Sequence, residues 1–261
     1  MKCLISCYST TGNTRLVADR IAEALSKAGV DTVVKNPVKQ PLDDVSDYDI
    51  VGFGTPTMAF KPSLGFFEVM GQVPTQKKPV PAFVFCTSGG EPVNTLRTMA
   101  SLLMQKSFVV IDGLEINAET NFPVARQFGG KALGLVGKPD EQELQAVNPF
   151  VDRLIKQFKT NPLRAKIFSF RISPLHFLGQ GAGAKELRRT MVLKRVNKNK
   201  CSQCAVCAQA CVARAIYLRP YPVFSNRCIG CWSCYNICPN EAITTLMTGG
   251  RGRYKGPALR R

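Results

Sequence analysis

The sequence predicts two folded units in one chain, a doubly wound α/β domain built on a parallel sheet and a smaller α+β unit rich in cysteine. Strand-like and helix-like apolar patterns alternate through residues 1–158, and eight of the 11 cysteines lie between residues 201 and 238. A chain of 261 residues has room for one domain of about 150 residues and a second, smaller one. We expect the units at 1–158 and 196–249, with a connecting segment at 159–195 and a tail at 250–261.

The first strand and the first helix are joined by a loop rich in hydroxyl groups. Lys2 to Tyr8 is an apolar run typical of a buried strand, and Thr14 to Ala28 has apolar residues at helical spacing before Gly29. Backbone amides and hydroxyls at the start of a helix favour binding of a phosphate group. The loop lacks the lysine of a Walker loop and consists of Ser9, Thr10, Thr11, Gly12, Asn13 and Thr14.

Two later strands end in further loops with polar and glycine residues. The strand expected at Asp49 to Phe53 is followed by a loop that contains Thr55, Pro56, Thr57, Met58 and Phe60. The strand expected at Pro81 to Cys86 is followed by Thr87, Ser88, Gly89, Gly90 and Glu91. Strands near residues 30–34 and 108–111 complete a sheet of order 2-1-3-4-5. In that order the carboxyl ends of the first, third and fourth strands meet at one ligand-binding switch point.

Residues 1–158 resemble the flavodoxin family. Its phosphate loop has the pattern S/T-x-T-G-x-T, and Ser9 to Thr14 fills every fixed position. The resemblance implies a flavodoxin-like doubly wound sheet that binds FMN, with the three loops above as cofactor-binding residues. The glycines of the third loop would let backbone amides approach the flavin ring. Flavodoxins usually stack aromatic side chains on the flavin, whereas the second loop offers only Met58 and Phe60, so we expect one flavin face to stay open. Phe60 has an alternative role of equal weight, in which its side chain anchors the loop in the core and does not contact the flavin.

The region after the fifth strand does not follow the alternation of strands and helices. Residues 113–138 contain turn signals at Phe122-Pro123 and Gly129-Gly130, and we interpret them as an insertion that covers the flavin. Asp140 to Phe158 returns to helical spacing and is expected to form the last helix of the domain. Three cysteines in the predicted strands are expected to be buried, inert thiols: Cys3, Cys7 and Cys86.

The remaining cysteines form two runs with one spacing, C-x2-C-x2-C-x3-C. In proteins with two 4Fe-4S clusters, the first three cysteines of such a run bind one cluster and the fourth binds the other. The expected ligands are Cys201, Cys204, Cys207 and Cys238 for the first cluster, and Cys228, Cys231, Cys234 and Cys211 for the second. A zinc site or disulfides are the alternative, but zinc sites seldom use eight cysteines in so compact a pattern.

The two cysteine runs belong to an internal repeat, residues 196–222 and 223–249, with a constant offset of 27 residues. The repeat resembles the bacterial two-cluster ferredoxin family, whose fold pairs two short strand-helix-strand units about a pseudo-twofold axis. Val212 stands where the first run usually carries a proline, which leaves the ligand set intact. The whole chain is similar to the flavodoxin–ferredoxin fusions of anaerobic bacteria and archaea. This resemblance implies one FMN and two 4Fe-4S clusters held in one chain for electron transfer.

Two functions are compatible with this set of cofactors. In the first, the chain is an electron carrier that converts between the two-electron chemistry of a flavin and the one-electron chemistry of the clusters. In the second, it is a flavin-dependent oxidoreductase that acts on a small molecule or a quinone, with the clusters as the electron port. Glu91 is the one carboxylate in the expected flavin loops, so the sequence offers no acid-base pair and no catalytic residue is assigned.

The net charge of +17 lies entirely in the second part of the chain. Residues 1–158 hold 16 basic and 16 acidic residues, whereas residues 159–261 hold 19 basic and 2 acidic ones. We expect the basic part to dock an acidic redox protein, with an anionic membrane surface as the second choice. A nucleic-acid partner is not expected, because no aromatic-basic recognition motif accompanies the charge. A homo-oligomer in which partners complete the electron path is compatible with the sequence.

The connecting segment and the tail carry less specific signals. Basic and apolar residues are mixed in 159–195, which allows peripheral membrane contact, although packing between the two units is preferred. The single histidine, His176, is expected to be structural. The tail is expected either to be solvated or to fold back onto a domain through Tyr254 and Lys255. The sequence has no apolar leader and no run of about 18 apolar residues, which favours a reduced, anaerobic cytoplasm.

Overall fold

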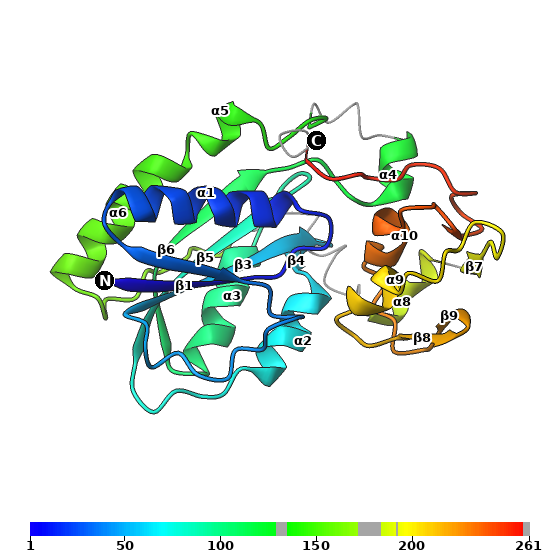
Figure 1. The fold of residues 1–261 in the computed structure, drawn as a ribbon. Coiled ribbons are helices and arrows are strands. Elements are labelled where there is room, and N and C mark those ends of the chain that lie inside the picture. Colours follow the sequence, from blue (N-terminus) through cyan, green and yellow to red (C-terminus); the bar gives the residue numbers. More distant parts are fainter. Residues whose placement is uncertain (129–134, 172–183, 192, 258–261) are drawn as a thin grey trace.

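The protein consists of a sheet covered by helices and a small C-terminal module beside it (Figure 1). The computed structural model describes residues 1–128, 135–171, 184–191 and 193–257. The module lies at the carboxyl ends of the parallel strands, while the N-terminus and the end of the last sheet-domain helix lie at the opposite end (Figure 1). The switch point of the sheet therefore faces the part of the chain that carries the two cysteine runs.

Five long parallel strands form the sheet in the order β2-β1-β3-β5-β6. They are β1 (Lys2–Cys7), β2 (Asp31–Lys35), β3 (Ile50–Met58), β5 (Val80–Ser88) and β6 (Phe108–Asn117). The short strand β4 (Lys61–Pro62) pairs antiparallel with the end of β3 and lies off this path. Counting only the long strands, the predicted order 2-1-3-4-5 is confirmed.

Three of these strands are longer than the sequence predicted. β3 continues past Phe53 because Thr55 and Pro56 still pair with Cys86 and Thr87 of β5. β5 continues to Ser88, and β6 follows it as far as Asn117. Our assignment of Thr55 to Met58, and of Thr87 with Ser88, to loops was therefore wrong. These residues are held by strand pairing, which fixes their positions more tightly than a loop would.

Two hydrophobic cores lie on opposite faces of the sheet. On one face α1 (Asn13–Lys27) and α6 (Val147–Thr160) pack on the strands, and on the other α2 (Leu64–Gln72) and α3 (Thr95–Met104) do so. β3 carries Gly52 and Gly54 because any larger side chain there would collide with the rings of Phe83 and Phe85 on β5. The predicted last helix is two helices, since α5 (Glu141–Leu144) ends before α6 begins.

The connecting segment only partly packs against the sheet domain. Phe168 packs on the core beside α3, whereas Ile167 is 92% exposed and Phe170 is half-exposed over the guanidinium of Arg97. The helix α8 (Ala184–Arg189) precedes the module. Several residues of the predicted apolar pattern lie outside the described residues: Ile172, Leu175, His176, Phe177 and Leu178. In the part of the chain that the structure describes, every helix is too short or too polar to cross a membrane.

The C-terminal module repeats one unit at the predicted offset of 27 residues. Its elements are β7 (Arg195–Val196), α9 (Val206–Gln209) and β8 (Ile216–Arg219), followed by β9 (Tyr221–Phe224), α10 (Ser233–Ile237) and β10 (Ile243–Thr244). The strands pair crosswise, β7 with β10 and β8 with β9. Left-handed backbone recurs at equivalent positions, for example at Ala205 and Trp232. The internal repeat is thus visible in the backbone as well as in the cysteine spacing.

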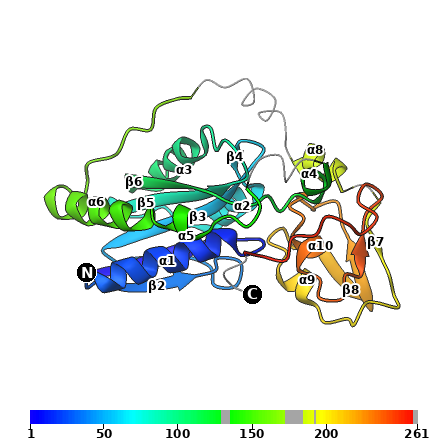
Figure 2. The same ribbon diagram turned by 90° about the horizontal axis from the view of Figure 1, so that it is seen from above.

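The tail folds back onto the sheet domain, which was one of the two alternatives for it. After β10 the chain leaves the module, passes α4 (Pro123–Phe128) and returns to the beginning of α1 (Figure 2). Tyr254 is 2% exposed, and Gly256 and Pro257 are also buried. The alternative of a solvated end is therefore wrong for the described part of the tail.

Candidate cofactor-binding sites

A polar hollow lies at the carboxyl ends of β1, β3 and β5, where the sequence predicted a ligand. Four segments line it: Ser9, Thr10, Thr11, Asn13 and Thr14; Pro56 and Thr57; Thr87, Ser88 and Gly89; and Ala118, Glu119, Thr120 and Asn121. The first three segments come from the predicted loops. The fourth follows the extended β6 and lies in 113–138, which we interpreted as a covering insertion without naming these residues. The sequence therefore predicted the residues of three sides of this hollow, and the register of β6 supplies those of the fourth.

The hydroxyl-rich loop opens the helix α1 in the way that phosphate binding requires. Gly12 adopts a left-handed backbone with φ of 106°, and its amide donates to the Ser9 hydroxyl oxygen at 3.2 Å. The Thr14 hydroxyl lies 2.8 Å from that of Thr87, which ties the helix start to β5. The first amides of a 15-residue helix and several hydroxyls thus converge at one point. This donor set fits the phosphate end of a flavin nucleotide.

The second predicted loop contributes less to the hollow than expected. Thr55 is fully buried, and its hydroxyl lies 2.9 Å from that of Ser63 at the start of α2. The Thr57 hydroxyl donates to that of Thr95 at 3.1 Å. Met58 and the half-buried Phe60 do not line the hollow. The β3 side of the site is therefore built from backbone and threonine side chains.

The third loop approaches the fourth segment closely. A side chain on Gly89 would collide with Thr120, since its β-carbon would lie 2.9 Å from the Cβ of Thr120. The Ser88 hydroxyl donates to the carbonyl of Gly90 at 2.5 Å and closes the turn. Glu91 is exposed and lies outside the hollow, so it supplies no proton-transfer group there. Gly89 therefore lets the segments after β5 and β6 meet at the hollow.

Two further hollows in the C-terminal module contain the cysteines. One is lined by all four predicted ligands of the first cluster, Cys201, Cys204, Cys207 and Cys238. The other is lined by all four predicted ligands of the second, Cys211, Cys228, Cys231 and Cys234, together with Cys207. All 11 cysteines are free thiols, so the disulfide alternative is wrong.

The number of thiols in each hollow fits an iron–sulfur cluster. Within residues 1–128, 135–171, 184–191 and 193–257, no group of three or more His, Cys, Asp or Glu side chains forms a site for a single metal ion. Each hollow nevertheless brings four predicted ligands together, and four thiolates fit a polynuclear iron–sulfur cluster, in which each thiolate binds a different iron.

Hydrogen-bond donors surround several of the cysteine sulfurs, as is expected for cysteines that are thiolates. The amides of Ala215 and Ala242, which are equivalent in the repeat, donate to Cys211 and Cys238 at 3.2 and 3.3 Å. The ammonium of Lys194 donates to the sulfur of Cys228 at 3.3 Å. Burial raises the pKa of Cys231 to about 11, so this thiol is costly to ionise without a bound cation. Binding of metal supplies that charge.

The C-terminal module contacts the hydroxyl-rich loop directly. The hydroxyl of Ser233, beside Cys234, donates to the carbonyl of Thr10 at 3.4 Å. The side-chain amide of Asn236 donates to the carbonyl of Asn121 at 2.8 Å. Thr10 and Asn121 line the polar hollow and Ser233 lines the second cysteine hollow, so these two hollows lie at one interface.

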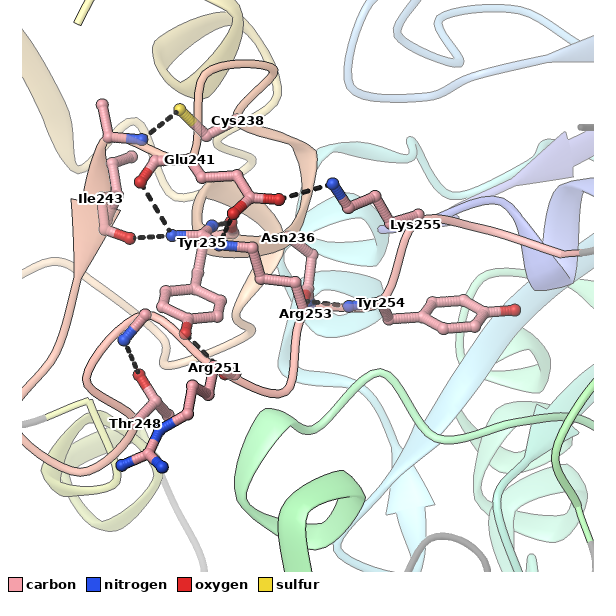
Figure 3. Close-up of polar contacts among 12 residues, drawn as sticks. Tyr235, Asn236, Cys238, Glu241, Ile243, Thr248, Arg251, Arg253, Tyr254 and Lys255 are labelled. Atoms are coloured by element: carbon pink, nitrogen blue, oxygen red, sulfur yellow. Dashed lines mark hydrogen bonds and ion pairs between the residues drawn. The ribbon is translucent and has the colours of Figure 1, made fainter. Parts of the chain in front are cut away.

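The tail completes this interface and was only partly anticipated. Tyr254 donates from its hydroxyl to Oδ1 of Asn13 at 2.5 Å and from its amide to Asn236 at 2.9 Å. Behind it, the guanidinium of Arg253 stacks 3.9 Å from the ring centre of Tyr235 and donates to backbone carbonyls of the module (Figure 3). Lys255 pairs with Glu241 at 2.5 Å. The tail is thus fixed to the module at one end and to the phosphate loop at the other.

Comparison with known families agrees with this architecture. Residues 5–145, more than half of the chain, match the family model described as flavodoxin. The chain belongs to the flavodoxin family. Residues 221–244 match the model of the 4Fe-4S binding domain. The chain is therefore a flavodoxin–ferredoxin fusion in architecture, with an N-terminal flavodoxin domain and a C-terminal 4Fe-4S binding domain.

Among solved structures, several flavodoxins are similar to the first domain. A flavodoxin from the domain Archaea is 18% identical, with a TM-score of 0.42, and the match covers 61% of this chain and 99% of that one. Flavodoxin 1 from Bacillus cereus is 20% identical, with a TM-score of 0.43, and the match covers 60% of this chain and 98% of that one. No curated protein matches the chain.

Proposed function

We propose that the chain is an electron-transfer protein that binds one FMN in the polar hollow and two 4Fe-4S clusters on the eight cysteines. The observation that carries this proposal is the shared interface, because the phosphate loop is contacted by the module that holds the cysteines. When bound, clusters pass single electrons, whereas a flavin exchanges one or two. The residues of this chain bind both kinds of group and hold them in a fixed relation. The predicted conversion between one- and two-electron steps follows from that arrangement.

Anaerobic purification with quantification of iron, sulfide and FMN tests the cofactors. About eight irons, eight sulfides and one FMN per chain are expected. Cys204→Ser and Cys231→Ser should each lower the iron content, because each removes one ligand of a different cluster. Cys86→Ser is the matched control, since Cys86 is buried in β5 outside the two runs and should leave the iron content unchanged. Stoichiometric zinc in place of iron would refute the proposal.

A basic groove on the C-terminal module supports an acidic redox protein as the partner. Its volume is about 900 Å³, and none of the described residues that line it is acidic. The basic residues among them are Lys185, Arg188, Arg189, Lys194, Lys198 and Arg219. Met191 and Phe224 line both this groove and the second cysteine hollow, and Pro222 lines both the groove and the first hollow. A partner in the groove would therefore lie one side chain away from each predicted cluster.

Charge reversal tests this docking surface. Lys185 and Arg189 are exposed on one face of α8, and their replacement by glutamate should slow electron transfer to an acidic two-iron ferredoxin about tenfold at low salt. The same variant should lose most of the salt dependence of that rate. The control is the double replacement of Lys77 and Lys78, exposed lysines of the flavodoxin domain, by glutamate. Equal slowing by both variants would mean that net charge alone matters.

A second candidate function is reaction of the flavin with a small molecule or a quinone. It is supported by one observation: neither Met58 nor Phe60 lines the hollow, and none of the described residues that do line it is aromatic, so no side chain among them would stack on a flavin ring. A panel of quinones and other small acceptors, mixed with the chemically reduced protein, tests it. Rapid and selective reoxidation by one acceptor would support this function, and slow, unselective reoxidation by all of them would support the carrier.

A further inference from the structure

Tyr8 lies between the phosphate loop and the cysteines of the second predicted cluster. It follows β1, directly precedes Ser9 and is 3% exposed. Its ring covers Gly65 at the start of α2, where a side chain would collide with it. Tyr8 also packs with residues from the C-terminal module, including the cysteines Cys211, Cys228 and Cys231. A residue of the flavodoxin domain thus belongs to the surroundings of the second cysteine hollow.

The hydroxyl of Tyr8 is a buried donor without an oxygen or nitrogen partner. Among the residues that the structure describes, it makes no hydrogen bond, and buried hydroxyl groups are rarely left in that state. The thiol of Cys231 lies beside it. Cys231 packs against the same cluster of buried side chains as Tyr8, so its sulfur is an acceptor that the fold brings to this hydroxyl.

We propose that the Tyr8 hydroxyl donates a hydrogen bond to the Cys231 sulfur of the bound second cluster, and that this cluster is the one next to the flavin. The proposal rests on the proposed function, because the acceptor is a ligand sulfur of a cluster. A donor to such a sulfur stabilises the more negative, reduced state and raises the reduction potential. Tyr8 is thus a tuning residue supplied by the flavodoxin domain to the cluster of the other domain.

The surroundings of the other cysteines also indicate that the second predicted cluster, and not the first, is the one next to the flavin. Cys204, a predicted ligand of the first cluster, is exposed, and all the described residues that line the first hollow belong to the module, between positions 201 and 243. The cysteines that pack with Tyr8 all belong to the second set. Electrons that leave the flavin would therefore meet the second cluster first and reach the first cluster near the surface.

Reduction potentials of the two clusters in Tyr8→Phe test the proposal. Phenylalanine keeps the ring that packs on α2 and removes only the hydroxyl. We expect the equilibrium constant for reduction of the second cluster to fall about tenfold, which is about 59 mV for one electron, with the first cluster unchanged. An anaerobic redox titration followed by electron paramagnetic resonance measures both, and Cys204→Ser, which alters only the first cluster, assigns the signals.

Tyr235→Phe is the matched control, since Tyr235 is fully buried in the module but donates to the carbonyl of Arg251 at 2.7 Å. It should leave the potential of the second cluster unchanged. Uniform replacement of tyrosine by the more acidic 3-fluorotyrosine should shift the reduction potential of the second cluster in the opposite direction to Tyr8→Phe. This shift should vanish when the replacement is made in the Tyr8→Phe protein. The fluorination shift in the protein that keeps Tyr8 can be measured even if Tyr8→Phe does not fold.

The possible results separate the two proposals. Loaded clusters with an unchanged second potential in Tyr8→Phe, and no effect of fluorination, would overturn the role of Tyr8 and leave the proposed function intact. A change in the reduction potential of the first cluster in Tyr8→Phe, in place of the second, would overturn the proposal that the second cluster lies next to the flavin. Absence of iron and sulfide from the wild-type protein would overturn the proposed function and this inference together.

Discussion

The hydroxyl of Tyr254 gives the most direct test of whether the C-terminal tail supports the phosphate loop. It donates to Oδ1 of Asn13 at 2.5 Å, and the Asn13 side-chain amide donates in turn to the carbonyl of Glu119 at 2.9 Å. Both residues are buried, with exposures of 2% for Tyr254 and 7% for Asn13. Replacement of Tyr254 by phenylalanine keeps the ring and leaves the Asn13 carbonyl oxygen without this donor. We expect weaker binding of FMN.

The expected size of the effect follows from the burial of this pair. A buried acceptor that loses its partner costs about 1–3 kcal/mol, because water cannot replace the donor. Asn13 lies in the first turn of α1, so movement of its side chain disturbs the donors that would hold the phosphate. If about half of that cost, about 0.5–1.5 kcal/mol, falls on the FMN-bound state, the dissociation constant rises about two- to twelvefold, since 1.4 kcal/mol corresponds to a factor of ten.

Quenching of FMN fluorescence during titration of the apoprotein measures this constant. Tyr217→Phe is the control, because Tyr217 is half-exposed in the C-terminal module and lies outside the phosphate site. A double-mutant cycle with Asn13→Ala should show strong non-additivity, since the two side chains act as one contact. A dissociation constant within twofold of wild type in Tyr254→Phe, or additive effects in the cycle, would refute the reasoning.

Three further predictions concern stability and cysteine reactivity. Arg253→Met should destabilise the C-terminal module by about 3 kcal/mol, because buried carbonyls lose a charged donor. The urea concentration at which half of the iron–sulfur absorbance is lost should fall accordingly. Arg251→Met is the control and should leave this midpoint unchanged, because Arg251 is exposed. Burial raises the pKa of Cys3 and of Cys86 to about 12, so mass spectrometry should find neither alkylated by iodoacetamide at pH 8 until the chain unfolds. Burial also raises the pKa of Glu115, which means that its ionised form destabilises the folded state. Glu115→Gln should therefore raise the urea midpoint of unfolding at pH 7, where Glu115 is ionised. This gain should disappear below pH 4.5, where the carboxyl group is protonated in both the folded and the unfolded state.

The order of the sheet could be predicted from local features, whereas the ends of its strands could not. Apolar runs and the loop that starts at Ser9 are visible in the sequence, and they are sufficient to recognise a doubly wound sheet. Thr55 and Thr87 are polar and look like loop residues, yet their backbone groups are paired within the sheet. Strand pairing depends on the neighbouring strand and not on the residue itself, so the sequence underestimated both strands.

The parts of the candidate site that the sequence did not predict depend on contacts between residues that are distant in the sequence. Ala118 to Asn121 reach the hollow only because β6 continues past Ile111, and the apolar alternation of Leu114 and Ile116 was the signal that could have shown it. Tyr254 is buried against Asn13, which is 241 positions away. The basic composition of the tail gave no sign of that partner, because burial of a charged segment is decided by the acceptors that it meets.

The phosphate loop is held by the C-terminal half along its length, and this changes how the two parts of the chain are expected to work together. Thr10 accepts a hydrogen bond from the module, and Gly12 and Asn13 contact Pro257 and Tyr254 of the tail. Two domains joined only by a linker would vary in separation, and electron transfer between them would depend on chance encounters. Here the contacts fix the flavin site against the cysteines. Among the residues that the structure describes, none lines both the basic groove and the polar hollow, so the proposed docking surface and the proposed FMN site are separate.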